Sequence, residues 1–286
     1  MTTGVPTGAG PDLPGHHWVR ALGAGGFADV HLYRQDVPAR DVAVKVVRTS
    51  LDRRGVDVLT READAMALVS GHPAVVALYA VGTTADGRRL LEMEYCPVVD
   101  IGERVRAHPL AVRRVLEIMI PICAGVEVLH RRSMVHRDIK PSNIMLNAFG
   151  RPVLGDFGVA LATGSRSHGA DDGFSVLWAP PEQQVAGTAA HPTQDVWALA
   201  TTTWTLLTGR SPFEDPLGDN SALAVATRVQ AGRLPALGRV DAPPALEEAL
   251  RQALVVDPAA RTPGAAEFGR ALQKVQTALH LPLTSV

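Results

Sequence analysis

Five polar side chains suited to chemistry lie between two short apolar runs in the segment MVHRDIKPSNIML, residues 134–146. Polar groups of this density usually avoid a protein core, so their position between apolar flanks indicates a functional loop. A carboxylate, cationic groups and a carboxamide together suit a reaction in which a proton moves and negative charge must be offset. The five residues are His136, Arg137, Asp138, Lys140 and Asn143.

A glycine-rich segment near the N-terminus offers a place for phosphate groups. Residues 22–30, LGAGGFADV, contain Gly23, Gly25 and Gly26 between two expected strands. Backbone amides that lack a neighbouring Cβ can approach phosphate oxygens closely. A plain glycine-rich hairpin is the alternative, and a dinucleotide-binding turn is disfavoured because a strand, not a helix, follows Ala28.

A lysine follows on the next expected strand, in the sequence VAVK at residues 42–45. Strand alternation places Lys45 on the same face as Ala43, from which it could reach phosphate oxygens under the glycine-rich segment. Glu62, on the helix that comes next, could hold the lysine in an ion pair. An exposed strand lysine is the alternative and is the commoner case.

The elements that must position these residues change character along the chain. Before Cys96 the pattern predicts short strands at 18–22, 28–34, 41–47, 75–82 and 88–95, with one helix at 56–69. After Cys96 it predicts long amphipathic helices at 110–131, 194–207, 221–231, 245–255 and 265–279. A small sheet domain joined to a larger helical domain is therefore expected.

Composition sets the broad class. Of the 286 residues, 46% are hydrophobic and 20% are charged, which is typical of a globular protein. The net charge of -1 lacks the excess of basic residues that a general nucleic-acid binder would have. Two cysteines, Cys96 and Cys123, favour a reducing, cytoplasmic location. No segment is long and apolar enough to predict membrane insertion. Residues 1–14, rich in glycine and proline, are expected to form a disordered tail.

Five short motifs follow one another along the chain. They are Gly23-x-Gly25-x-Phe27-x-x-Val30, Val42-Ala43-Val44-Lys45, His136-Arg137-Asp138 through Asn143, Asp156-Phe157-Gly158, and Pro181-Glu182. Their order resembles that of eukaryotic-type Ser/Thr protein kinases, and the resemblance extends from about Trp18 to Leu279. The composition, rich in Ala, Arg and Gly, resembles the bacterial, particularly actinobacterial, branch. The resemblance implies an α+β, bilobal protein kinase fold with a small antiparallel-sheet N-lobe (15–95), carrying one main helix, a larger mostly helical C-lobe (96–280) and a C-terminal tail (281–286).

The resemblance assigns roles to the catalytic loop. Phosphoryl transfer depends mainly on positioning and on neutralising charge around the nucleotide. By this resemblance Asp138 would accept the proton of the attacking hydroxyl and Lys140 would offset charge on the transferred group. Asn143 and Asp156 would bind magnesium, or manganese in its place. His136 would support the loop by packing and backbone hydrogen bonds, without titrating.

ATP contacts are implied in the same way. Lys45, fixed by Glu62, would hold the inner phosphates, Met93 is the gatekeeper residue, and backbone groups of Glu94 and Cys96 would pair with adenine. Met66 would pack with His136 and Phe157. The nucleotide-binding residues implied by the resemblance are Leu22, Gly23, Gly25, Gly26, Val30, Ala43, Lys45, Glu62, Met93, Glu94, Cys96 and Asp156.

Substrate class and supporting contacts are also implied. The form Asp-Ile-Lys-Pro-Ser-Asn at residues 138–143 resembles the Ser/Thr-specific loop, so protein serine and threonine hydroxyls are the expected substrates, including those of the enzyme itself through a transient homodimer. Asp195 would tie the catalytic loop to a central helix, and Arg261 would pair with Glu182.

Some positions depart from the family pattern. Ala28 replaces the third loop glycine, Ser175 stands where a threonine is usual, Pro180 where an alanine is usual, and Leu161 where many relatives carry a basic residue. Two alternatives stay open. A pseudokinase scaffold is disfavoured because the catalytic residues are all present, and a small-molecule phosphotransferase is disfavoured by Asp195 and the expected Glu182–Arg261 pair.

The expected activation segment, between Asp156 and Glu182, contains four hydroxyl residues that autophosphorylation could modify. Arg137 resembles the arginine that pairs with an activating phosphate. The usual second basic partner is missing at Leu161, and Asp171 and Asp172 could partly satisfy Arg137 without any phosphate. The hydroxyl residues are Thr163, Ser165, Ser167 and Ser175.

We therefore predict that phosphorylation of this segment changes activity by less than about tenfold, or about 1.4 kcal/mol. The test is a variant with alanine at Thr163, Ser165 and Ser167, assayed on an external protein substrate. Activity within tenfold of the unchanged chain is expected. A loss of several hundred-fold would instead establish a strict phosphate switch.

Overall fold

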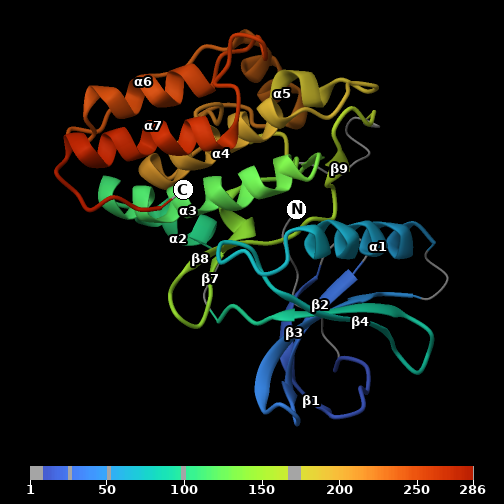
Figure 1. Cartoon of the computed structure of the whole chain (residues 1–286). Coiled ribbons are helices and arrows are strands. Elements are labelled where there is room, and N and C mark those ends of the chain that lie inside the picture. The colour runs from blue at the N-terminus through green and yellow to red at the C-terminus, as the bar shows by residue number, and fades with distance from the viewer. Residues whose placement is uncertain (1–8, 25–27, 50–52, 98–100, 167–174, 286) are drawn as a thin grey trace.

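The computed structural model describes residues 9–24, 28–49, 53–97, 101–166 and 175–285, which form a small sheet lobe and a larger helical lobe (Figure 1). The sheet is antiparallel with strand order β1-β2-β3-β5-β4, and one helix packs beside it. This confirms the expected α+β, bilobal arrangement. The elements of this lobe are β1 (His16–Ala24), β2 (Ala28–Gln35), β3 (Arg40–Val47), α1 (Arg53–Leu68), β4 (Leu78–Thr83) and β5 (Arg89–Glu94).

The second lobe is mostly helical and carries two small two-stranded sheets, β6-β9 and β7-β8. The short apolar runs that flank the polar loop form β6 and β7. The elements are α2 (Ile101–Ala107), α3 (Val112–Arg131), β6 (Met134–Val135), η1 (Pro141–Asn143), β7 (Ile144–Leu146), β8 (Pro152–Leu154), β9 (Leu161–Ala162), η3 (Pro181–Gln184), α4 (Pro192–Thr208), α5 (Ala222–Ala231), α6 (Pro244–Ala253) and α7 (Ala265–Ala278).

Strand β3 has buried side chains on both faces of the sheet. Its even-numbered valines, Val42, Val44 and Val46, pack with Tyr33 in one apolar cluster, whereas Val47 packs with α1 on the opposite face. Lys45 shares the α1 side, because side chains alternate along a strand. The predicted orientation of Lys45 is therefore confirmed.

Residues 9–14 differ from the expected disordered tail. Leu13 is buried in the outer-face cluster with Tyr33 and Val42, and the Tyr33 hydroxyl donates a hydrogen bond to the Pro11 carbonyl at 2.6 Å. This segment covers the face of the sheet opposite α1. Composition alone missed it because one buried leucine among glycines and prolines produces no periodic pattern.

The segment between α1 and β4 connects the two lobes. It was expected to be strand from residue 75, but it is a loop whose backbone bonds to β8, with Val76 N donating to Leu154 O at 3.0 Å and Leu154 N to Ala74 O at 2.9 Å. Gly125 on α3 lies beneath it, and a Cβ there would come within 3.3 Å of Ala74 O. The absence of a side chain at Gly125 allows this close approach.

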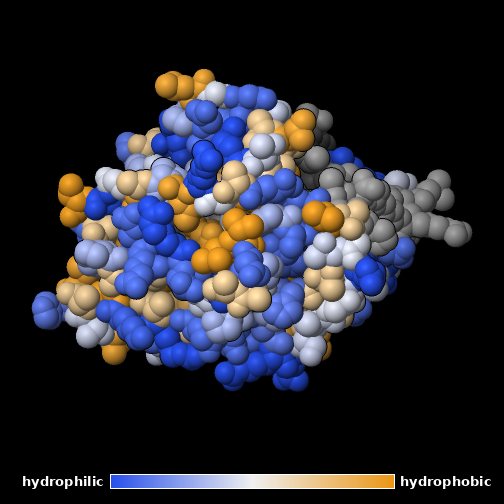
Figure 2. Space-filling model, turned by 90° about the horizontal axis from the view of Figure 1, so that it is seen from above, coloured by the Kyte–Doolittle hydropathy of each residue, from blue (hydrophilic) through white to orange (hydrophobic). Residues whose placement is uncertain are grey.

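Apolar residues of α3, α4, α6 and α7 form the main core of the helical lobe. Viewed from above this lobe, the surface is mostly hydrophilic and its apolar residues occur in small groups (Figure 2). Within the described ranges, no helix combines the length and apolar character needed to cross a membrane. Helix α2 was not predicted, because seven residues are too few to give a clear helical period.

The C-terminal tail makes contacts that the sequence did not predict. Leu281 packs against the helical core, and Thr284 exchanges hydrogen bonds with Gln276, a residue of α7 that is only 1% exposed. Residues 281–284 are therefore docked on α7. The sequence indicated a tail only because residues 281–286 follow the last predicted helix, and this gave no sign of the contacts with α7.

Candidate active site

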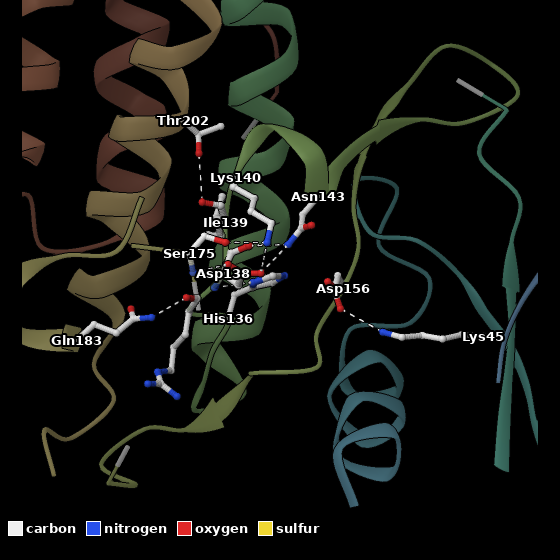
Figure 3. Close-up of polar contacts among 11 residues, drawn as sticks. Lys45, His136, Asp138, Ile139, Lys140, Asn143, Asp156, Ser175, Gln183 and Thr202 are labelled. Atoms are coloured by element: carbon white, nitrogen blue, oxygen red, sulfur yellow. Dashed lines mark hydrogen bonds and ion pairs between the residues drawn. The ribbon is translucent and has the colours of Figure 1, made fainter. Parts of the chain in front are cut away.

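Lys45 lies at the centre of a chain of ion pairs between the two lobes. Its Nζ donates to the two carboxylate oxygens of Glu62 on α1 at 2.6 and 2.8 Å. The same Nζ donates to Asp156 Oδ1 at 3.2 Å (Figure 3). Burial alone would lower the pKa of Lys45, but the carboxylates of Asp156 and Glu62 raise it overall. The ammonium therefore stays charged, and the predicted Lys45–Glu62 pair is present.

Asp156 follows β8 in a left-handed backbone conformation, with φ of 61°. The Lys45 ammonium lowers the pKa of Asp156 to about 2, against the opposing effect of burial, so the side chain is ionised at neutral pH. One carboxylate oxygen contacts Lys45, and the side chain is 49% exposed. An ionised, half-exposed carboxylate of this kind is suited to binding a hard cation.

Asp138, Lys140, Asn143 and Ser175 form a compact polar cluster (Figure 3). Lys140 Nζ donates to Asp138 Oδ2 and to Ser175 Oγ, both at 2.8 Å, and Asn143 Nδ2 donates to Asp138 Oδ2 at 3.1 Å. Ser175 N donates to Asp138 Oδ1 at 3.2 Å. Burial raises the pKa of Asp138, and the Lys140 ammonium partly opposes that shift. A raised pKa makes a carboxylate a better proton acceptor.

His136 packs next to this cluster and binds the backbone of Asp138. Burial lowers the pKa of His136, which favours a neutral ring, and its Nδ1 accepts a hydrogen bond from Asp138 N at 3.3 Å. Its ring lies 4.7 Å from that of Phe157, centroid to centroid, and Phe157 shares an apolar cluster with Met66 of α1. The expected contacts of Met66, His136 and Phe157 are therefore consistent with a supporting role for His136.

Asp195 connects the loop to α4. Its two carboxylate oxygens accept hydrogen bonds from His136 N at 2.8 Å and from Arg137 N at 2.7 Å. His130 Nε2 lies 2.8 Å from Asp195 Oδ2. Burial alone would raise the pKa of Asp195, but the hydrogen bonds from His130 and from the backbone lower it overall. The predicted contact is present, and His130 is a partner that sequence analysis missed.

Several of the predicted nucleotide-binding residues lie on paired strands of the sheet lobe. Gly23 of β1 lies opposite Val30 of β2, and Leu22 precedes Gly23, whereas Gly25, Gly26 and Phe27 lie outside the described residues. Ala43 and Met93 are paired across β3 and β5. The strand register therefore pairs Gly23 with Val30 and Ala43 with Met93, and their contacts with a nucleotide stay a prediction.

The segment after β5 begins at Tyr95. The Glu94 N–H donates to Ala77 O at 2.8 Å, so an adenine contact at Glu94 would use its carbonyl oxygen. Burial, reinforced by Glu94, raises the pKa of the Cys96 thiol to about 12, which keeps it protonated. Strand β5 ends one residue earlier than expected, and this leaves Tyr95 and Cys96 in the connection between the lobes.

Asn143 and Asp156 offer oxygen ligands suited to a divalent cation, and phosphate oxygens would supply further ligands to the same ion. Because Asn143 Nδ2 donates to Asp138, its amide oxygen is the atom left to serve as a ligand, and Asp156 adds an ionised carboxylate. Among the described residues, no group of three or more His, Cys, Asp or Glu side chains could hold a metal. Two protein oxygen ligands are what a nucleotide-bound magnesium ion needs.

The described parts of the predicted activation segment are held by backbone hydrogen bonds. Gly164 N donates to Ala190 O, and Ala190 N donates to Ser165 O, both at 2.8 Å, and Thr163 N donates to Ser133 O at 2.7 Å. Ser167, Asp171 and Asp172 lie outside the described residues. The backbone bonds stabilise residues 163–165 without any added phosphate.

At the other end of this segment, Glu182 forms the predicted pair with Arg261. Arg261 Nη1 and Nη2 donate to the two carboxylate oxygens of Glu182 at 2.7 and 3.2 Å. The same guanidinium also donates to three backbone carbonyls, those of Thr193, Val255 and Val256. Arg261 therefore connects the end of the segment to the main core.

Comparison with known proteins places these motifs in a family. A model of the protein kinase domain matches residues 16–266 of the chain. The chain is 34% identical over 261 residues to the serine/threonine-protein kinase PknK of Mycobacterium tuberculosis. The aligned segment covers 90% of this chain and 23% of that protein.

The chain is also 33% identical over 265 residues to the serine/threonine-protein kinase PknB of Mycolicibacterium smegmatis. This alignment covers 89% of this chain and 42% of that protein. PknB of Mycobacterium tuberculosis is 32% identical over the same length. The chain spans less than half the length of these relatives.

The Arg261–Glu182 geometry predicts the effect of breaking this pair. Glu182→Ala removes the carboxylate that neutralises the fully buried guanidinium of Arg261. We therefore expect the free energy of unfolding to fall by about 3 kcal/mol. Glu247→Ala is the matched control, because it removes an exposed helix ion pair with Arg251 and should cost at most about 0.5 kcal/mol. Urea denaturation measures both, and equal small losses would contradict a structural role for the buried pair.

Proposed function

The chain belongs to the protein kinase family, and from that premise we propose that it transfers the terminal phosphoryl group of ATP to serine and threonine hydroxyls of proteins. The observation that carries the proposal is the convergence of two polar groups at the junction of the lobes. One is the Glu62–Lys45–Asp156 chain, and the other is the cluster around Asp138. Together they supply cations for phosphates and a carboxylate for the attacking hydroxyl.

In the proposed mechanism each residue has one task. Lys45, held by Glu62, binds inner phosphate oxygens. Asp138 orients the substrate hydroxyl and accepts its proton as the oxygen attacks. Lys140, which contacts both Asp138 and Ser175, offsets negative charge on the transferred group. Asn143 and Asp156 would hold magnesium, or manganese in its place, which neutralises charge on the phosphates when bound.

A protein substrate is favoured over a small alcohol by the anchoring of the segment that ends at Glu182. Ser175 lies against the catalytic residues, and Glu182 is tied to the core through Arg261. This arrangement gives a fixed surface beside Asp138 on which an extended peptide could lie. Labelling of a generic protein, compared with labelling of aminoglycoside-like alcohols, distinguishes the two substrate classes.

Further parts of the proposal rest on the sequence. We place the lobes at 15–95 and 96–280, and we propose a cytoplasmic enzyme because both cysteines, Cys96 and Cys123, are free thiols. A net charge of -1 favours protein partners over nucleic acid. Autophosphorylation would use a transient homodimer. These points are separate from the chemistry and can fail without it.

The charge roles predict a large loss of activity on substitution. Lys45→Met and Asp156→Ala should each reduce phosphoryl transfer by at least about 100-fold, because each removes charge next to the phosphates. Lys274→Met, on the exposed side of α7, and Asp41→Ala, in a surface pair with Arg34, are matched controls that should keep full activity. Near-normal turnover in a folded Asp156→Ala protein would refute the site assignment.

Nucleotide binding can be tested separately from turnover. We predict that millimolar ATP with magnesium raises the melting temperature, because a ligand that binds only the folded state stabilises it. The shift should shrink on chelation of the metal and in Asp156→Ala. A shift without magnesium-dependent turnover would favour the scaffold alternative, whereas the absence of any shift would count against ATP as the ligand.

A further inference from the structure

The backbone around Asp138 is held by buried side chains. Three consecutive carbonyl oxygens each accept a hydrogen bond from a side chain, and the donors come from three different elements. Asn143, in η1, holds the carbonyl of Asp138 itself at 2.7 Å. The carbonyls on either side belong to Arg137, bonded by Gln183 Nε2 at 2.7 Å, and to Ile139, bonded by Thr202 Oγ1 at 3.2 Å. The proposed mechanism uses Asn143 but gives no task to Gln183 or Thr202.

Thr202 is placed by the helix that also carries Asp195. The two residues are seven positions apart on α4, which is about two helical turns, so they share one face of the helix. Asp195 binds the N–H groups at the start of the catalytic loop, and Thr202 binds a carbonyl just beyond Asp138. One face of one helix therefore fixes the loop at two points, and neither side chain is exposed.

Gln183 is placed by the ion pair next to it. It lies in η3 directly after Glu182, which Arg261 holds, and its side chain is 1% exposed. Its amide approaches the loop from a different direction than Thr202 (Figure 3). The carbonyl that it binds belongs to Arg137, whose φ of 68° is unfavourable for a residue other than glycine. Such strain persists only where surrounding contacts enforce it.

We infer that Gln183 and Thr202 are positioning residues for Asp138. By fixing the peptide groups before and after it, they hold its carboxylate in the direction that the substrate hydroxyl requires. Neither residue touches a reacting group, so both act through the backbone. The inference rests on the proposed phosphoryl transfer for its catalytic consequence, but the hold on the loop is a separate physical property.

The chain offers a close control for Thr202. Thr203 lies on the same helix, is equally buried, and donates its hydroxyl at 2.7 Å to Leu199 O within its own helix. Thr→Val at position 203 therefore removes a buried hydroxyl without affecting the catalytic loop. Thr202→Ser keeps the hydroxyl and serves as the conservative variant.

The experiment compares Thr202→Val, Thr202→Ser, Thr203→Val and Gln183→Leu. Activity is expressed per nucleotide-binding site, so that partial misfolding does not count as lost catalysis. We expect kcat to fall about tenfold in Thr202→Val and in Gln183→Leu, with KM for ATP changed less than about twofold, because the Lys45 and Asp156 contacts are untouched. Thr202→Ser should recover most of kcat, and Thr203→Val should keep it.

Hydrogen–deuterium exchange of the peptide that contains residues 136–139 gives a readout independent of activity. Exchange should accelerate in Thr202→Val and Gln183→Leu but not in Thr203→Val. Equal losses of kcat in Thr202→Val and Thr203→Val, or unchanged exchange in both loop variants, would overturn the inference. If the unchanged chain transfers no phosphoryl group, the proposed function fails, while the exchange result still decides whether these two residues hold the loop.

Discussion

The buried carboxylate of Asp195 is the contact on which the rest of the site depends. A carboxylate with no exposure to water is costly unless hydrogen bonds compensate it. Here the compensation comes from two consecutive backbone N–H groups, those of His136 and Arg137, and from the His130 ring. The charge of Asp195 thereby fixes the backbone immediately before Asp138.

A charged and an uncharged set of contacts both link the two lobes within the described residues. The charged one runs from Glu62 through Lys45 to Asp156 and brings the sheet lobe to the residues expected to bind phosphates and metal. The uncharged one consists of backbone hydrogen bonds between the α1–β4 loop and β8, at the position where Gly125 leaves room. Helix α1 carries Glu62, which binds Lys45, and Lys45 binds Asp156. A movement of α1 would therefore alter these ion pairs directly.

The predicted activation segment is held by contacts in both of its described stretches, residues 157–166 and 175–181 with Glu182 after them. Residues 163–165 bond through the backbone to the chain before α4, and Glu182 is anchored by Arg261. Gln183, next to that anchor, reaches back to the catalytic loop. The position of the segment and the geometry of Asp138 are therefore coupled through a small number of hydrogen bonds. Such coupling provides a physical route by which a change in this segment could alter catalysis.

The sequence by itself determined the order of the motifs, the lobe type, most helices and strands, and the Asp138, Lys140 and Asn143 members of the polar cluster, whereas Ser175 joins that cluster only in the folded structure. These are local signals: the spacing from Asp138 to Asn143, the alternation of β3 and the period of the long helices. The helix that follows β3 already suggested the pair of Lys45 with Glu62, whereas the pair of Glu182 with Arg261 followed from the resemblance alone. Short elements such as α2 gave too little pattern to predict.

Only the tertiary structure decided which buried polar residues hold the catalytic loop. His130, Gln183 and Thr202 lie 65, 46 and 63 positions from the residues that they contact, and within their own elements nothing distinguishes them from ordinary helix residues. Leu13 is a similar case, since its burial depends on a sheet formed later in the chain. Hydrogen bonds and burial between distant segments depend on how elements pack, and packing leaves no periodic trace in the sequence.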